Sequence, residues 1–287
     1  MQAIRSILVV IEPEHADTLA LKRAKLIAGV TQSHLHLLIC DESVDHSGHL
    51  RQLCNALQQD GYSVSAQQAW RGSLHDTIAH AQQTEGCGLV IKQHRPDNPL
   101  KKALLTPDDW KLLRYCPCPV LLVKTLTPWS GGTVLAAVDV GNIDGEHRAL
   151  HTLIIEHGYD IAKLAKAELH VLSAHPSPML TAADPTFQLR DTVEERYRQD
   201  CQAFQNTYDI DDGHLHIAEG PADVLIPQLA HELHAAVTVI GTVARTGFSG
   251  ALIGNTAEVI LDTLESDVLV LKPDSIVEHL EQRLGES

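Results

Sequence analysis

A glycine-rich stretch, "GTVARTGFSGALIGNTAE" at residues 241–258, carries the clearest chemistry in this sequence. It follows an apolar run, residues 237–240, and precedes a segment with the pattern of a helix. Glycines let a backbone pass close to a ligand, and the free N–H groups at a helix N-terminus attract phosphate. The stretch is therefore a candidate phosphate-binding loop, although a turn that leads into a helix explains its glycines equally well. These glycines are Gly241, Gly247, Gly250 and Gly254.

Polar residues in this stretch could complete a phosphate site. Asn255 or Thr256 stands where the cap of the next helix is expected, and Glu258 follows Asn255 at the spacing of a capping box. Arg245 could add a positive charge that binds phosphate. These features point to an anion held at a helix N-terminus.

The eighteen histidines raise the question of a metal site. In "HELH", residues 231–234, the histidines stand one residue too close for a metalloprotease helix, so we expect a solvated helix face. The two "HLH" triplets, residues 34–36 and 214–216, each place two imidazoles on one side of a strand, which could hold zinc. Neither triplet has an evident third and fourth ligand. We therefore assign no metal ligand from the sequence and expect pH sensitivity instead.

Sequence signatures of enzymes are missing. The chain has neither a G-x-S-x-G nucleophile elbow nor a G-x-x-x-x-G-K-[ST] phosphate loop. Ser249 lies among glycines, but nothing in the sequence supplies it with a base. The six cysteines include no C-x-x-C pair, and Cys116 and Cys118 flank prolines at the entry to a strand. We predict no catalytic residue, and we expect reduced, structural thiols.

The elements that position these residues occur twice. "ILVVIEPEHAD" at residues 7–17 matches "VLAAVDVGNID" at residues 134–144, and "CPVLLVK" at 118–124 matches "SDVLVLK" at 266–272. The order of the matches is kept along the chain, which indicates a tandem duplication. A length of 287 residues agrees with two domains of about 140 residues each.

Within each copy, short apolar runs alternate with longer amphipathic segments. Runs such as "VTVIG" and "VLVLK" have no polar alternation, which indicates strands buried on both faces by helices. The fold class predicted is α/β, with two tandem five-stranded, parallel, doubly wound, Rossmann-like domains. We place the first domain at residues 1–127, a linker at 128–132, the second domain at 133–273 and a C-terminal tail at 274–287.

The glycine stretch, the "DVLVLKP" that follows it and the early "AAVD" resemble the universal stress protein family, in particular its tandem, two-domain members. The resemblance covers nearly the whole chain and implies an adenine-nucleotide site. Gly241, Gly254 and Asn255 match the family's nucleotide-binding pattern, and Thr256 follows as a hydroxyl ligand. The resemblance also places Asp139 at the ribose and Val171, at the end of the second strand, at the adenine.

Two departures from that pattern bear on binding. Ala244 stands where the pattern has glycine, and a methyl group there costs on the order of 1 kcal/mol if the position needs positive φ or phosphate contact. The corresponding stretch of the first copy has no glycine, and "TPDD" places Thr106 as a helix cap with Asp108 and Asp109 behind it. Those carboxylates would repel a phosphate. We expect a weakened site in the second domain and none in the first.

Charge sets the class of partner. The 22 basic and 37 acidic residues give a net charge of −15, which opposes binding to nucleic acid or an anionic membrane surface. No apolar run is long enough for a signal peptide or a membrane span, so we expect a cytoplasmic protein. The two copies are expected to pack as a pseudo-dimer, and a homodimer of the chain is compatible with the sequence.

Two functions are open at this point. One is a stress-response regulatory protein that binds ATP or another adenine nucleotide in its second domain, with at most very slow hydrolysis. The other is a non-enzymatic stress or adhesion-linked interaction protein that binds another small ligand, such as a lipid or metabolite, or no nucleotide.

Overall fold

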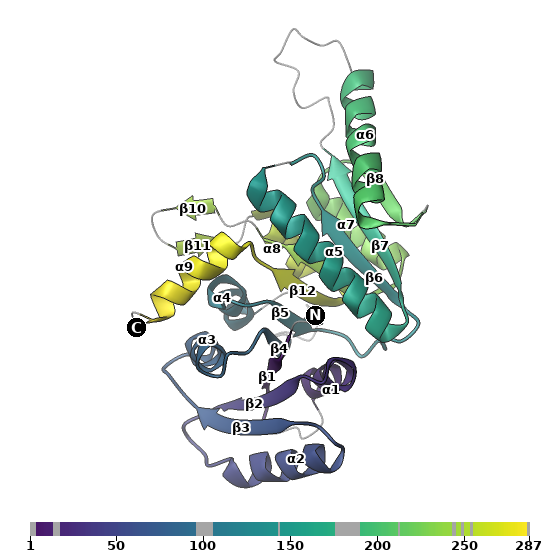
Figure 1. Cartoon of the computed structure of the whole chain (residues 1–287). Helices are drawn as coiled ribbons and strands as arrows, with labels where there is room; N and C mark the ends of the chain where they lie inside the picture. Colours follow the sequence, from purple (N-terminus) through teal and green to yellow (C-terminus); the bar gives the residue numbers. More distant parts are fainter. Residues whose placement is uncertain are drawn as a thin grey trace.

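A computed structural model describes nine segments of the chain, and Figure 1 shows their arrangement. The backbone alone is described for residues 190–196, 245–247, 250–252, 255–256 and 258. None of the helices in this part of the chain is long and apolar enough to cross a bilayer. The described residues are 4–13, 18–95, 106–142, 144–175, 190–211, 213–242, 245–247, 250–252 and 255–285.

The first repeat alternates strands and helices along its whole length. Its elements are β1 (Ser6–Val10), α1 (Leu19–Thr31), β2 (His34–Cys40), α2 (Ser47–Gln59), β3 (Val64–Ala69), α3 (Leu74–Thr84), β4 (Leu89–Gln93), α4 (Pro107–Tyr115) and β5 (Val120–Val123). Thr106 caps α4 as predicted, because its side chain accepts a hydrogen bond from the Asp109 N–H and a reciprocal bond completes the capping box.

The second repeat follows the same plan with one addition. Its elements are β6 (Thr133–Val138), α5 (Gly145–Ala165), β7 (Glu168–His175), α6 (Arg190–Tyr208), β8 (Leu215–Glu219), α7 (Ala222–Glu232), β9 (Ala235–Gly241), β10 (Arg245–Gly247), β11 (Gly250–Leu252), α8 (Asn255–Thr263), β12 (Asp267–Leu271) and α9 (Asp274–Gly285). The addition is an antiparallel pair, β10 and β11, inside the glycine stretch, which the sequence analysis did not predict.

Ten strands form one sheet in the order β3-β2-β1-β4-β5-β12-β9-β6-β7-β8. Neighbouring strands are parallel except at the β5–β12 pair, which joins the two repeats (Figure 1). One cluster of buried apolar residues packs the sheet against α1, α2, α5 and α6, and a second packs its other face against α3, α4, α7 and α8. Since both faces are covered, the strands lack polar alternation, and the predicted α/β fold class is confirmed.

The β5–β12 junction is reinforced by two lysines at equivalent positions of the repeats. Lys124 donates from Nζ to the Leu261 carbonyl at 3.0 Å, close to the end of α8. Lys272, which is buried, donates to the Cys116 carbonyl at 2.9 Å, where α4 ends. Each repeat thus supplies the cation that binds a helix C-terminus of the other, where carbonyl groups lack intrahelical partners.

A buried carboxylate, Asp267, stands at the start of β12 with no exposed surface. It accepts hydrogen bonds from Arg23 Nε and Trp129 Nε1, both at 2.8 Å. The backbone N–H groups of Lys124 and Thr125 also donate to it, at 2.8 and 3.0 Å. One carboxylate therefore ties α1, the segment after β5 and the first strand residue of β12 together.

Asp267→Ala would leave the Arg23 guanidinium buried without its counter-charge. We expect the free energy of unfolding to fall by about 3–5 kcal/mol in urea denaturation. Asp60→Ala is the matched control, because Asp60 pairs with Lys25 at the same 2.8 Å distance but with both side chains exposed. Its loss should stay below about 1 kcal/mol. Equal losses would show that burial adds nothing to the Asp267 pair.

Candidate functional site

The strand order of the second repeat reverses between β6 and β9. The chain runs from β6 outward to β7 and β8 and then returns to β9 on the other side of β6. Ligands of open α/β sheets bind beyond the carboxyl ends of the strands at such a reversal. Asp139 follows β6 and Gly241 ends β9, and the register Ala137 to Ile240 makes these two ends neighbours. The structure therefore brings together two of the predicted site residues.

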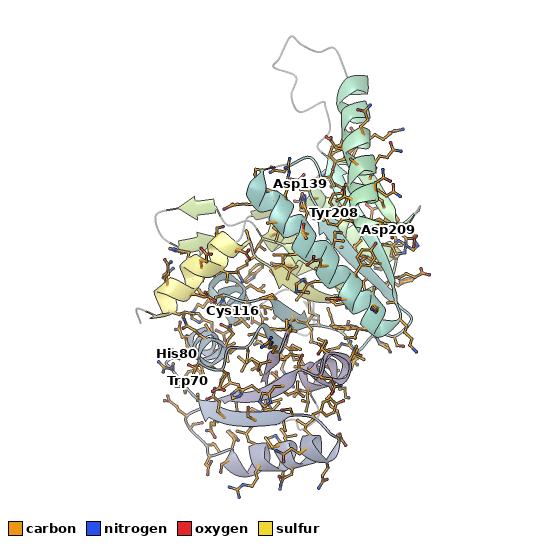
Figure 2. The ribbon with its side chains drawn as sticks, viewed as in Figure 1. Trp70, His80, Cys116, Asp139, Tyr208 and Asp209 are labelled. Atoms are coloured by element: carbon orange, nitrogen blue, oxygen red, sulfur yellow. The ribbon has the colours of Figure 1, made fainter. Side chains whose placement is uncertain are left out.

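Asp139 lies beside the start of α5 in Figure 2. Its side chain is exposed, yet burial by surrounding protein atoms raises the pKa of its carboxyl, while the nearby His147 and a hydrogen bond from the Gly141 backbone act in the opposite direction. In the part of the chain that the structure describes, Asp139 forms no ion pair. Its carboxylate can accept hydrogen bonds from the hydroxyl groups of a ligand.

Gly241 has a structural reason to be glycine. A Cβ atom at this position would lie 2.5 Å from Leu150 Cδ2 and 3.0 Å from Ile154 Cδ1, both on α5. Such contacts are closer than van der Waals distance, so a side chain here would push α5 away from β9. The first glycine of the candidate loop is needed for packing, whether or not a ligand binds.

Val171 lies elsewhere than the sequence analysis placed it. β7 continues to His175, so Val171 is in the middle of the strand and not at its end. Its side chain has no exposed surface and belongs to the core that faces α5 and α6. An adenine ring finds no surface of Val171 in this arrangement.

Two residues that the sequence analysis missed form a wall near Asp139. Ser173 on β7 and Tyr197 on α6 share a hydrogen bond at 2.5 Å, and the Val140 N–H donates to the Ser173 hydroxyl at 3.2 Å. Burial raises the pKa of Tyr197. A Cβ on Gly141 would lie 3.1 Å from the Tyr197 ring, so the glycine of "VGNID" was the one available signal for this contact.

The remaining predicted residues are placed in part. Arg245 lies in β10, and Asn255 and Thr256 begin α8, as expected, but their side chains are not described. Ala244 and Gly254 lie outside the described residues. The helix N-terminus of the predicted phosphate site therefore exists at Asn255.

The first repeat fills its own reversal point, between β1 and β4. Glu12, the counterpart of Asp139 in the repeat, forms an ion pair with Arg95, just beyond β4. Gln93, at the end of β4, accepts the Leu19 N–H at 2.9 Å and so completes the start of α1. Side chains of the protein occupy the positions where a ligand would bind.

The acidic start of α4 is also internally paired. Asp109 is fully buried and contacts Lys92 Nζ at 2.8 Å and His94 Nδ1 at 2.7 Å. Burial alone would raise its pKa, but the hydrogen bond from His94 and the charge of Lys92 outweigh burial and hold the pKa well below its usual range. This carboxylate is thus ionised at the helix N-terminus, where a phosphate would otherwise bind.

The sequence pattern of the universal stress protein family matches residues 41–124 and residues 132–272, which together make up most of the chain. The chain belongs to the universal stress protein family. In the second repeat the match includes Asp139 and the glycine stretch. In the first repeat it begins after β2, so Glu12 falls outside the matched residues.

Relatives in this family match over nearly the full chain. "Universal stress protein E" of Salmonella typhi is 30% identical, and the alignment covers 96% of each protein. "Universal stress protein E homolog" of Haemophilus influenzae is 28% identical, with 89% of this chain and 84% of that protein covered.

Solved structures agree with this assignment. A protein of Pseudomonas aeruginosa PAO1, described as functionally unknown, is 67% identical with a TM-score of 0.93, and the match covers 100% of this chain and 99% of that one. A universal stress protein of Archaeoglobus fulgidus DSM 4304 has a TM-score of 0.60 at 14% identity, covering 94% and 99%, and shares the fold alone.

A histidine lies directly behind the Asp139 loop of this universal stress protein. His151 on α5 is buried, hydrogen-bonds to the Asp139 backbone, and leaves its Nε2 without a partner. Burial, followed by the charge of His147, lowers the pKa of His151 to about 4. The folded protein thus holds this ring neutral at pH values where the unfolded chain protonates it.

Gly241→Ala should lower the free energy of unfolding by about 1–3 kcal/mol, because the new methyl overlaps Leu150. Adding Leu150→Ala should relieve part of the overlap, so the double variant loses less than the sum of the single losses. Gly145→Ala is the control, because a Cβ there meets nothing within 4 Å. Strictly additive losses, measured by urea denaturation, would show that these positions do not clash.

Acidification should destabilise the protein through His151. Because its folded pKa lies below the unfolded value of about 6.5, the unfolded state binds more protons below that pH, and stability falls from there toward pH 4. His151→Leu should remove on the order of 1–2 kcal/mol of the loss between pH 7 and pH 5. Exposed His231→Gln should leave the loss unchanged in the same urea titrations. An undiminished loss in His151→Leu would assign the pH sensitivity to other groups.

Proposed function

We propose that this universal stress protein is a stress-response regulator that binds an adenine nucleotide weakly and in its second repeat alone. The observation that carries the proposal is the difference between the two reversal points. In the first, Glu12 is paired with Arg95 and Gln93 completes α1. In the second, within the described residues, Asp139 has no ion pair, and its neighbour across the sheet is Gly241.

Each part of the second site has a proposed role. Asp139 would accept hydrogen bonds from the ribose hydroxyls, and the N-terminus of α8, with Asn255 and Thr256, would bind the phosphates. Gly254 would let the backbone approach them. Val171 would contribute to the adenine pocket as core packing and not as an exposed contact, because it has no accessible surface.

Binding without turnover is part of the proposal. The sequence supplies the glycine stretch with no evident general base, and hydrolysis needs a group that activates water. Ala244 would weaken the phosphate contacts further. The protein would then report nucleotide level through binding, with ATP hydrolysis far below the usual range of enzymes, about 1 s⁻¹ and above.

Isothermal titration with ATP and ADP tests the site. Asp139→Asn should weaken binding about tenfold by removing a charged acceptor. The matched control is Glu12→Gln, which changes the equivalent residue of the first repeat and should leave the affinity unchanged. Ala244→Gly should tighten binding about fivefold, and Gly254→Asp should eliminate it.

Two results would contradict the proposal. Equal affinity in all variants would show that the glycine stretch is structural. A loss with Glu12→Gln but not with Asp139→Asn would move the nucleotide to the first repeat. If the unmodified protein binds neither nucleotide, the alternative of an interaction protein with another ligand replaces this function.

A further inference from the structure

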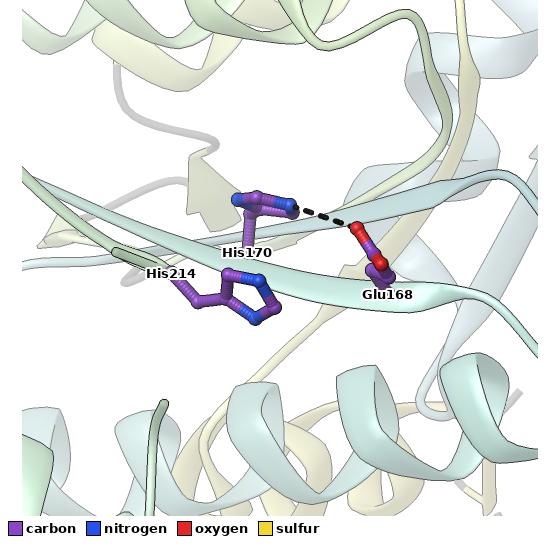
Figure 3. Close-up of side chains that lie close together, drawn as sticks. All are labelled: Glu168, His170 and His214. Carbon is purple, nitrogen blue, oxygen red and sulfur yellow. Dashed lines mark ion pairs between the residues drawn. The ribbon is translucent and has the colours of Figure 1, made fainter. Parts of the chain in front are cut away.

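Four titratable side chains gather at the opposite end of β7 and β8 from Asp139. Glu168 and His170 lie at the start of β7, His214 directly precedes β8 and His216 is its second residue. Figure 3 shows Glu168 and His170 directed toward each other, with His214 beside them. The potential ligand atoms of Glu168, His170 and His214 all lie within 4.8 Å of one another.

The distances within this cluster leave room for an ion. His170 Nε2 and Glu168 Oε2 are 3.8 Å apart, which is longer than a hydrogen bond. Zinc binds imidazole nitrogen and carboxylate oxygen at about 2.0–2.2 Å, so two ligand atoms on one tetrahedral ion are roughly 3.4 Å apart. The His170 and His214 ring centroids are 4.3 Å apart. Small side-chain rotations therefore suffice to bring the three ligand atoms around one ion.

His216 orients His170 in this cluster. His170 Nδ1 and His216 Nε2 are 2.9 Å apart, so one nitrogen donates a hydrogen bond to the other. If Nδ1 of His170 carries the proton, its Nε2 presents a lone pair toward Glu168. Metal-binding histidines characteristically donate their second N–H to such a partner.

The surroundings favour neutral imidazoles and access from solvent. Burial, followed by the neighbouring His214 and His216, lowers the pKa of His170, and burial followed by His214 lowers that of His216. Neutral rings are the form that binds metals. The His170 side chain is 11% exposed, whereas that of Glu168 is 73% exposed, so a cation can enter past the carboxylate.

The first repeat shows what the same positions do without ligands. The repeat alignment places His34 and His36 at the positions of Glu168 and His170, and the strand registers place Ser65 opposite, at the position of His214. The Ser65 hydroxyl lies 2.7 Å from both His34 Nε2 and His36 Nδ1. A serine that hydrogen-bonds two rings is replaced in the second repeat by a third potential ligand.

We propose that Glu168, His170 and His214 form a binding site for a zinc-class divalent cation, with water as the fourth ligand and His216 as the residue that positions His170. Two imidazoles and one carboxylate suit Zn²⁺ far better than Mg²⁺ or Ca²⁺, which prefer oxygen ligands. The site is independent of the nucleotide proposal, because it uses the opposite ends of the strands.

Zinc titration of the EDTA-treated full chain by calorimetry, at pH 7.5 with the thiols kept reduced, tests the site. We expect one tight equivalent that excess Mg²⁺ does not displace. His170→Gln and His214→Ser should each weaken it at least about tenfold. His36→Gln, at the equivalent position of the first repeat, is the matched control and should keep it. His216→Phe should retain one equivalent with reduced affinity, since His170 loses its orienting partner.

Circular dichroism of each variant establishes that it is folded, and half-exposed His214→Ser serves if buried His170→Gln is not. Unchanged zinc affinity in a folded His214→Ser variant would overturn the site. So would displacement by Mg²⁺, or the same loss in His36→Gln, which would place the zinc elsewhere. Complete loss in a folded His216→Phe variant would make His216 a ligand and overturn the assignment of roles.

Discussion

The arrangement of the two repeats depends on the buried carboxylate of Asp267. A charge without exposed surface is costly unless it is fully hydrogen-bonded, and here four donors from two separate segments of the first repeat and the residues after it surround one side chain. Those donors are correctly placed when α1, the end of β5 and the start of β12 are all in position. The carboxylate therefore makes the β5–β12 pairing specific, because a shifted register would leave Arg23 and Asp267 unpaired.

Duplication of one fold has led to two different reversal points on the same scaffold. The first repeat satisfies its polar groups internally, through Glu12 with Arg95 and Asp109 with Lys92 and His94. The second leaves Asp139 with a raised pKa beside Gly241. The difference arises from a few side chains at strand ends, while the buried apolar runs that build the sheet remain alike.

The sequence predicted most of the fold because its signals are local. Strands such as "VTVIG" are apolar throughout since both faces are covered, and "TPDD" is a capping box that needs no distant partner. The misplaced end of β7 and the unpredicted β10–β11 pair show the limit of such signals, because strand length and hairpin pairing depend on neighbours in space. Gly241 was identified, but its contact with Leu150 requires the position of α5.

The same limit explains the metal-ligand cluster. "HLH" at residues 214–216 suggested two ligands on one strand, whereas the structure pairs His216 with His170 and sets His214 beside Glu168. The register between β7 and β8 brings these residues together across more than forty positions of sequence. Local spacing contains no information on that register.

The antiparallel β5–β12 pair reverses the direction of one repeat relative to the other. The carboxyl ends of β1 and β4 consequently point to one edge of the ten-stranded sheet, and those of β6 and β9 point to the opposite edge. The two reversal points open on different sides of the molecule and cannot form a shared cleft. A ligand in the second repeat is therefore out of reach of the first, and each crevice is free to change its chemistry without altering the other.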